Sequence, residues 1–286
     1  MTEQSHTGFY GKLPSLGDFV SRRLPREFID ALDAWLQDAI DLSRQQLLEG
    51  WMDKYLISPV WSFALSPGLA GETGWLAVMM PSVDRVGRYF PFVIAQPVAP
   101  GESIIKSLAR NGEWFARANQ LIYTGLDDTA FDLEQFDAQV AALADVYVES
   151  VPAGVQPAAD FGLGWRLGTV DLPDAHEALL TQMLASRLAA FSVWWTEGSQ
   201  FVESSYLVSS GLPEPLAYTA MLSGDWQTHG WSDWGPIPSD APVHAEAVPV
   251  AAQPAAVEQP GSADPAAALV EDVSEPAAVI EPQGER

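Results

Sequence analysis

The sequence predicts a layered α/β sandwich in which helices flank a mixed central sheet. Apolar residues recur at helical spacing in several long segments, and short, almost continuously apolar runs lie between them. Strands that are apolar at nearly every position are buried on both faces, so helices are expected on each side of the sheet. With 286 residues and 48% hydrophobic content, the chain is long enough to bury such a core.

The segment 25–47 gives the clearest helical pattern. Pro25 suits the first turn of a helix, and apolar residues then recur on one face. These residues are Phe28, Leu32, Trp35, Leu36, Ile40 and Leu47. A second helix is predicted over 103–123, with one apolar face made of Ile104, Leu108, Phe115 and Ile122. Three further helices are predicted at 132–144, 175–190 and 214–223.

Five strands are predicted from apolar runs rich in aromatic and β-branched residues. They are 60–65, 74–80, 89–98, 192–197 and 204–211. The last two are expected to form a hairpin. Core packing is predicted for Trp51, Trp61, Trp75, Trp194 and Trp195, the last two on opposite faces of one strand. The cluster of Trp226, Trp231 and Trp234 either closes the core or forms a partner-binding patch.

The composition changes at residue 237 to Ala, Pro, Val and acidic residues without any aromatic residue. Such a segment buries too little apolar surface to offset its ordering entropy. We therefore predict one α/β domain over 1–236, with a turn-rich region at 125–160, and a disordered Ala/Pro/acidic tail over 237–286. The tail is either a solubilising appendage or an electrostatic mimic that competes for a basic partner surface.

Charge and motif content exclude several function classes. A net charge of −24 opposes binding to a phosphate backbone, so nucleic acid is not expected. No signal peptide or membrane-spanning run is recognised, which favours the cytoplasm. Cysteine is absent and the four histidines are scattered and expected at the surface, so no metal site is predicted. Glycine patterns fit neither a P-loop nor a dinucleotide fingerprint, and no cofactor is expected.

Two charged segments are not explained by packing, namely "GFYGKLPSLGDFVSRRLPR" (8–26) and "SVDRVGR" (82–88). The first also carries Asp18 and the second Asp84. Together they hold six of the fourteen basic residues: Lys12, Arg22, Arg23, Arg26, Arg85 and Arg88. A structural corner is one interpretation, in which Asp84 pairs with an arginine and Gly87 supplies a positive φ. A face that binds an anion or an acidic partner is the second, and a catalytic Asp/Arg site is the third.

An ordered series of motifs resembles the TagF family of type VI secretion-associated proteins. The series comprises "GFYGKLPSLGDFVSRRLP", "SPVWSFALSPGLAG", "GWLAVMMPSVDRVGRYFPFVIA", "SVWWTEGS" and "SSGLP", and it runs through roughly residues 8–225. The resemblance implies an α/β sandwich fold. It provides no catalytic motif, so Lys12, Asp18, Arg22, Arg23, Asp84, Arg85 and Arg88 enter as structural or partner-facing residues.

The same resemblance implies a function. TagF proteins are cytoplasmic, non-enzymatic repressors that act on the secretion apparatus after translation, together with the forkhead-associated scaffold protein Fha. Fha is therefore the expected partner. A hydrolase with a spatially assembled site at Asp18, Asp84, Arg85 and Arg88 is the alternative. The sequence leaves the oligomeric state open.

Overall fold

A computed structural model of the chain describes residues 7–99, 101–126, 131–143 and 172–233, with side chains of 172–178 left undescribed. The chain divides into two units, Met1–Trp234 and Gly235–Arg286, and the description below concerns the first. The predicted tail at 237–286, most of the turn-rich region at 125–160, and Trp234 lie outside the described residues. So do His6, His244 and the side chain of His176.

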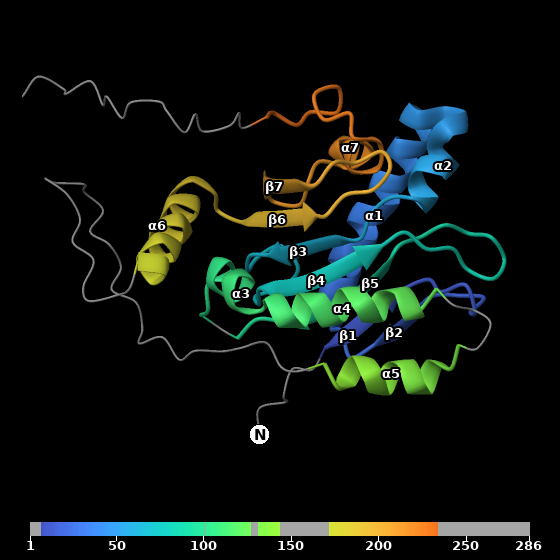
Figure 1. Cartoon of the computed structure of the whole chain (residues 1–286), viewed down its shortest axis with the longest axis horizontal. Coiled ribbons are helices and arrows are strands. Elements are labelled where there is room, and N and C mark those ends of the chain that lie inside the picture. Colours follow the sequence, from blue (N-terminus) through green and yellow to red (C-terminus); the bar gives the residue numbers. More distant parts are fainter. Residues whose placement is uncertain (1–6, 100, 127–130, 144–171, 234–286) are drawn as a thin grey trace, which may run out of the picture. The chain divides into compact units, whose positions relative to one another are not determined.

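A seven-stranded sheet forms the middle layer, with strand order β2-β1-β5-β4-β3-β6-β7 (Figure 1). The strands are β1 (Gly8–Gly11), β2 (Val20–Arg22), β3 (Trp61–Leu65), β4 (Trp75–Met80), β5 (Phe92–Pro97), β6 (Phe191–Thr196) and β7 (Ser205–Ser210). All residues of β3, β4 and β5 are buried, as their apolar runs predicted. The expected hairpin is confirmed, since β6 pairs antiparallel with β7.

The predicted α/β sandwich is confirmed, but its mixed sheet is not. Every ladder between the described strands is antiparallel. A continuous apolar run reports that both faces of a strand are covered, and it carries no information on strand direction. The loops from β3 to β4 and from β4 to β5 contain no crossover helix, and such short connections join antiparallel neighbours.

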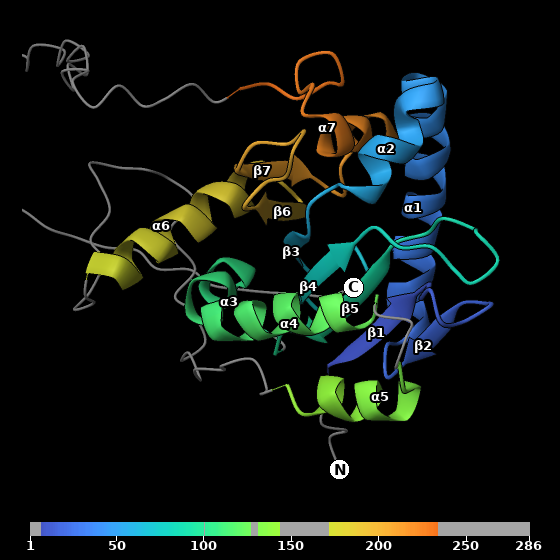
Figure 2. The same cartoon turned by 45° about the vertical axis from the view of Figure 1, so that its right-hand side comes forward.

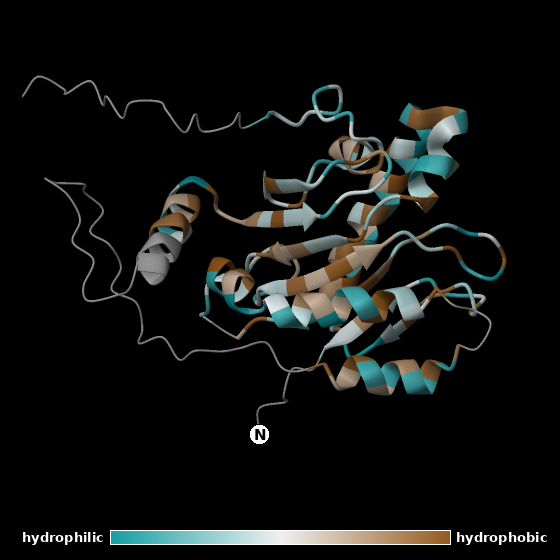
Figure 3. Ribbon diagram, viewed as in Figure 1, coloured by the Kyte–Doolittle hydropathy of each residue, from teal (hydrophilic) through white to brown (hydrophobic). Residues whose placement is uncertain are grey.

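Helices cover both faces of the sheet (Figures 1 and 2). One face carries α1 (Arg26–Leu47), the 3-10 turn η1 (Leu48–Gly50), α2 (Trp51–Leu56), the 3-10 turn η2 (Pro215–Ala217) and α7 (Tyr218–Ser223). The other carries α3 (Ile104–Arg110), α4 (Gly112–Thr124), α5 (Leu133–Ala141) and α6 (Leu172–Arg187). In Figure 3, apolar residues mark the strands of the sheet and alternate with polar residues along α4, as expected for a helix half-buried on the sheet.

The helix predicted at 25–47 is confirmed as α1, with Pro25 as its N-cap. The segment predicted as one helix at 103–123 is two helices, because the backbone leaves helical geometry at Asn111, with φ −108° and ψ 28°. The amide of the Asn111 side chain donates to the Ser107 carbonyl at 2.7 Å. Both halves still place the predicted apolar face on the sheet.

The predicted tryptophans pack in the core on the expected sides. Trp51, Trp61, Trp75 and Trp194 are buried on the α1 side of the sheet. Trp195 is partly buried on the opposite side, which confirms the predicted alternation. Trp226 and Trp231 are partly buried against the α1-side core, and the Trp231 indole donates to the Ala217 carbonyl at 2.9 Å.

Strands β1 and β2 and helix α2 have no counterpart in the sequence predictions. Strand β1 has glycine at both ends, and Gly11 has a φ of 134° that only glycine adopts readily. Helix α2 has six residues, fewer than the roughly 11–18 over which a helical period is recognised. The segment after β1 and helix α2 contribute to the candidate site.

Candidate functional site

A charged corner lies where the β4–β5 loop meets the segment after β1. We define the charged corner as residues 82–88 together with residues 12–18. The loop is closed by a bridge between Val83 and Tyr89 and by a hydrogen bond from the Asp84 N–H to the Arg88 carbonyl at 3.0 Å. Gly87 adopts a φ of 85° at the tip, so the positive φ expected of this glycine is present.

The carboxylate of Asp84 is the centre of the corner and is fully buried. Its Oδ1 accepts the backbone N–H of Val86 at 3.0 Å and that of Arg88 at 2.8 Å. Its Oδ2 accepts the Nε of Arg88 at 2.7 Å and lies 3.1 Å from the Nζ of Lys12. Each carboxylate oxygen therefore has two N–H partners, which is the pattern of a structural ion pair rather than of a free base.

Burial alone would raise the pKa of the Asp84 carboxyl. The hydrogen bonds from the Arg88 backbone and guanidinium and from the Lys12 ammonium outweigh it and hold the pKa well below its usual range. Asp84 therefore stays ionised at neutral pH. A carboxylate with so low a pKa is a poor general base.

This shift predicts an acid-sensitive contribution to stability. Because the folded-state pKa is depressed, the contribution is complete above the unfolded pKa of about 3.9 and is lost as the pH falls through the lower folded value. We expect the difference in unfolding free energy between the native chain and Asp84→Asn to be constant near pH 6 and to shrink below about pH 4. Urea unfolding across pH 2.5–6.5 measures it. A difference that stays constant down to the lowest pH contradicts the ion pair.

Backbone and hydroxyl groups join the two segments of the corner. The Ser82 hydroxyl donates to the Lys12 carbonyl at 2.7 Å, and the Arg85 N–H donates to the Leu16 carbonyl at 2.9 Å. The Arg88 guanidinium donates to the Gly17 carbonyl at 2.7 Å. From α2, the Tyr55 hydroxyl donates to the Ser82 carbonyl at 3.0 Å and accepts its N–H at 3.2 Å. The corner is therefore fixed from three parts of the chain.

The arginines of the 8–26 segment contact helices rather than the corner. Arg23 forms an ion pair with Asp137 of α5 at 2.6 Å and donates to the Thr7 carbonyl at 2.7 Å. Arg22 lies 3.9 Å from Glu134, also on α5. Arg26 lies 3.6 Å from Asp30 on the exposed first turn of α1. These residues join β2 to α5 or stabilise a helix, and the structure does not bring them to Asp84.

Asp18 and Arg85 lie at the surface of the corner without a close ion pair. Asp18 is exposed and its Oδ1 lies 3.8 Å from the Arg88 Nη2, a separation at which an exposed pair contributes little. The Arg85 side chain is exposed and lies over Gly17, and no carboxylate of the described residues is within 4 Å of its guanidinium. Arg85 is thus the cation of the corner that is available to a partner.

A cavity of about 500 Å³ adjoins the corner on the α2 side. Its described lining residues are Arg44, Trp51, Met52, Gly87, Arg88 and Tyr89. The Arg44 guanidinium lies over the Trp51 ring, 4.4 Å from its centroid. The sequence predictions did not include Arg44 or Met52, because the cavity forms only when α1, α2 and the β4–β5 loop come together.

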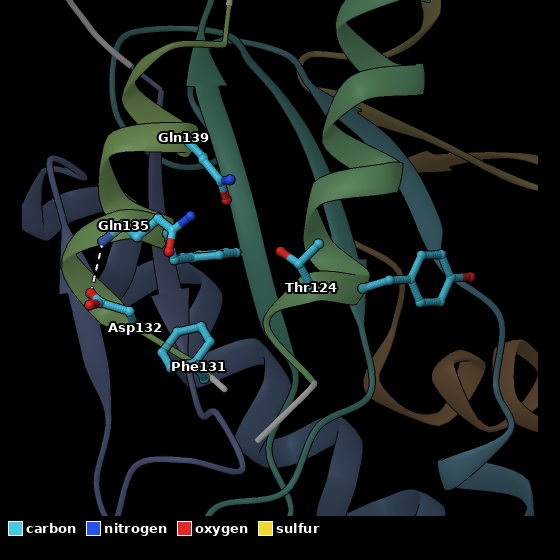
Figure 4. A pocket seen from close by; sticks show the side chains of 7 residues that line it. Thr124, Phe131, Asp132, Gln135 and Gln139 are labelled. Carbon is cyan, nitrogen blue, oxygen red and sulfur yellow. Dashed lines mark hydrogen bonds between the residues drawn. The ribbon is translucent and has the colours of Figure 1, made fainter. Parts of the chain in front are cut away.

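A second cavity, of about 460 Å³, lies between the end of α4 and α5 (Figure 4). Asp132 and Gln135 are among its lining residues, and Figure 4 shows their hydrogen bond. Asp132 is the N-cap of α5 and accepts the N–H groups of Glu134 and Gln135 at 2.9 and 3.0 Å. Its carboxylate therefore has a structural role.

The described part of the chain contains neither a metal-binding cluster nor a membrane-spanning helix. Within the described part of the chain, no group of three His, Asp or Glu side chains has the arrangement of a metal site. His229 is buried, contrary to the surface position expected for it, because it lies in the turn that packs Trp226 and Trp231 on the core. No helix among the described residues is both long and apolar enough to cross a bilayer.

The fold and the site define a class of protein: an α/β sandwich with an antiparallel sheet that displays a rigid, cation-bearing corner. Residues 8–143 match the family model described as TagF N-terminal domain, type VI secretion system-associated. The crystal structure of PA0076 from Pseudomonas aeruginosa PAO1 is 34% identical in sequence and superposes with a TM-score of 0.64. That alignment covers 77% of this chain and 94% of PA0076. No match was found among curated proteins.

The chain belongs to the TagF family, and its N-terminal half carries the type VI secretion-associated domain. The family assignment based on the motif series is thereby confirmed. The matched region, 8–143, contains the whole charged corner and the cavity beside it.

Proposed function

We propose that this protein is a cytoplasmic, non-enzymatic repressor of type VI secretion that acts after translation by binding the scaffold protein Fha. Membership of the type VI secretion-associated TagF family carries the proposal. A protein that acts by sequestration needs a complementary surface and no reactive group. The exposed Arg85 offers a cation on such a surface, and its backbone is held in place by the hydrogen bond from its N–H to the Leu16 carbonyl.

The geometry of the charged corner does not favour the alternative function, a hydrolase. The Asp84 carboxylate is fully buried and accepts N–H groups on both oxygens. Asp18 is exposed, 3.8 Å from Arg88. A substrate would have to displace the bonds that close the β4–β5 loop in order to reach Asp84. These contacts support a binding role for the corner over a hydrolytic one.

Deletion of the gene is the first test of the proposal. In a strain whose type VI secretion is repressed, we expect deletion to raise effector secretion and the full-length chain to restore repression. Immunoblotting of culture supernatants measures the effect, with a cytoplasmic marker as the lysis control. Unchanged secretion after deletion contradicts the repressor role.

Arg85→Ala tests whether the corner takes part in partner binding. We expect the full-length variant to recover Fha about fivefold less efficiently than the native chain, with an unchanged thermal midpoint, because the side chain makes no described ion pair. Arg26→Ala is the matched control, since Arg26 is also exposed and lies on α1. If Arg85→Ala and Arg26→Ala recover Fha equally well, the corner has a purely structural role.

A further inference from the structure

An exposed apolar stripe runs along η1 and α2 beside the cavity of the corner. Leu48 is 73% exposed, Met52 47% and Leu56 48%, and the three are spaced four residues apart. Ile57, directly after α2, is also exposed. We call Leu48, Met52, Leu56 and Ile57 the α2 stripe. Apolar (brown) segments are visible in this helical region in Figure 3. Several large apolar side chains exposed close together in sequence are typical of a binding surface.

The cavity gives the stripe a concave, cationic border. Met52 belongs to both, because it lines the cavity and accepts a hydrogen bond from the Tyr89 hydroxyl at 3.0 Å. Arg44 and Arg88 line the cavity, and no carboxylate is among its described lining residues. The two acidic residues next to the stripe in sequence, Glu49 and Asp53, do not line it. The exposed Val86 directly precedes Gly87, which lines the cavity at the loop tip.

The charge of this surface contrasts with that of the whole chain. The chain carries a net charge of −24, yet Arg44 and Arg88 line the cavity beside Met52 of the stripe. Arg44 is held over Trp51 and Tyr89 by cation–π contacts, at 4.4 and 5.9 Å from the ring centroids, and has no described carboxylate within 4 Å. Arginines placed in this way suit a carboxylate-bearing ligand.

Leu48 provides an independent observation. It adopts φ 48° and ψ −127°, a backbone conformation that is strained for a bulky residue. Its side chain is largely exposed, so burial within the described residues does not offset that strain. Glycine fits such a position at the end of a helix better than leucine does. A leucine there is explained if its side chain is used at an interface.

We propose that the α2 stripe and its arginine border dock an acidic amphipathic segment of a partner protein. The inference rests on the proposed function, since it names the surface and the partner chemistry of a protein that acts by binding. Aliphatic side chains of the segment cover the stripe, and its carboxylates pair with Arg44 and with the exposed part of the Arg88 guanidinium. An anionic membrane fits less well, because the net charge of −24 opposes it.

The test uses the full-length protein and a fluorescein-labelled synthetic helix in which glutamates flank a stripe of leucines. Fluorescence anisotropy measures binding, and a helix with lysine in place of glutamate is the charge control. We expect the glutamate helix to bind at least tenfold more tightly than the lysine helix. Met52→Glu is expected to weaken binding by about tenfold, since it places a carboxylate in the stripe. Equal binding of the two helices overturns the proposal.

Two control variants separate this surface from others. Met183→Glu makes the same change at an exposed methionine of the apolar groove between α6 and β7, and is expected to leave binding unchanged. Arg26→Glu reverses a charge at the first turn of α1, outside the lining of the cavity, and is likewise expected to leave binding unchanged. If Met183→Glu weakens binding and Met52→Glu does not, the docking site is the other groove and the proposal is wrong.

Leu48→Gly gives a result that a purely structural role for Leu48 does not produce. We expect the variant to raise the thermal midpoint by about 2–4 °C, through relief of the positive-φ strain, and at the same time to weaken binding of the glutamate helix. If stability increases while binding of the glutamate helix is unchanged, Leu48 is not part of the docking surface and the proposal is contradicted.

Other occupants are outcomes that overturn the assignment. Tighter binding of a synthetic peptide of residues 263–286 than of the glutamate helix assigns the surface to the chain itself. Sedimentation with anionic vesicles that Met52→Glu abolishes assigns it to a membrane, and a dimer that Met52→Glu dissociates assigns it to a second copy. If Met52→Glu loses binding of the glutamate helix but still represses type VI secretion, this inference alone is overturned. If the native chain binds the glutamate helix but deletion of the gene leaves secretion unchanged, the repressor function is overturned instead.

Discussion

Replacement of Asp84 with alanine is expected to lower the free energy of unfolding by about 3–5 kcal/mol. The substitution leaves the Lys12 ammonium, whose side chain is only 6% exposed, without its carboxylate. It also removes the acceptor for the backbone N–H groups of Val86 and Arg88. An uncompensated buried cation is costly, since its hydration is not restored in the folded state. Urea unfolding at pH 7 measures the loss.

Two further variants establish the cause of this loss. Asp18→Ala removes an exposed carboxylate 3.8 Å from Arg88 and is expected to cost less than about 1 kcal/mol. In the double variant Lys12→Met/Asp84→Ala, no buried cation remains at position 12, and part of the stability is expected to return. If the loss of unfolding free energy in the double variant equals the sum of the losses in the two single variants, the Lys12–Asp84 pair is not the source of the loss.

The fold class could be predicted because its main elements are long or strongly apolar. The apolar face of α1 and the runs of β3, β4 and β5 each indicate one secondary structure without tertiary context. The direction of the strands could not be predicted from burial, since two-sided burial is compatible with either direction. The break at Asn111 depends on a side-chain hydrogen bond to Ser107, which periodicity does not report.

The corner could be predicted only in part. Local sequence suffices to pair Asp84 with Arg88, four residues away. The pairing with Lys12 depends on the register of β1 against β5, which places Gly11 opposite Phe92 and brings Lys12 to the loop. The α2 stripe has a signal in the sequence, namely apolar residues four apart at 48, 52 and 56, but the same spacing predicts a buried helix face. Their exposure becomes known only from the packed structure.

The close approach of β1 to β5 makes Gly11→Ala the second substitution with a large expected effect. A Cβ at Gly11 would lie 2.2 Å from the Pro91 carbonyl oxygen and 2.8 Å from the Phe92 Cα, both backbone atoms that cannot rotate away. The φ of 134° adds strain for any residue with a side chain. We expect a loss of about 2–6 kcal/mol, from about 1–3 for the backbone strain and a similar amount for overpacking.

Gly87→Ala separates the two contributions. Gly87 also has a positive φ, of 85°, but an added Cβ there would meet no atom within 4 Å. We therefore expect Gly87→Ala to cost about 1–2 kcal/mol from strain alone, clearly less than Gly11→Ala, when both are measured by urea unfolding. Equal losses would mean that β1 can move away from Pro91. In that case the position of Lys12 beneath Asp84 is not set by the approach of β1 to β5, and the corner is held by its own loop bonds.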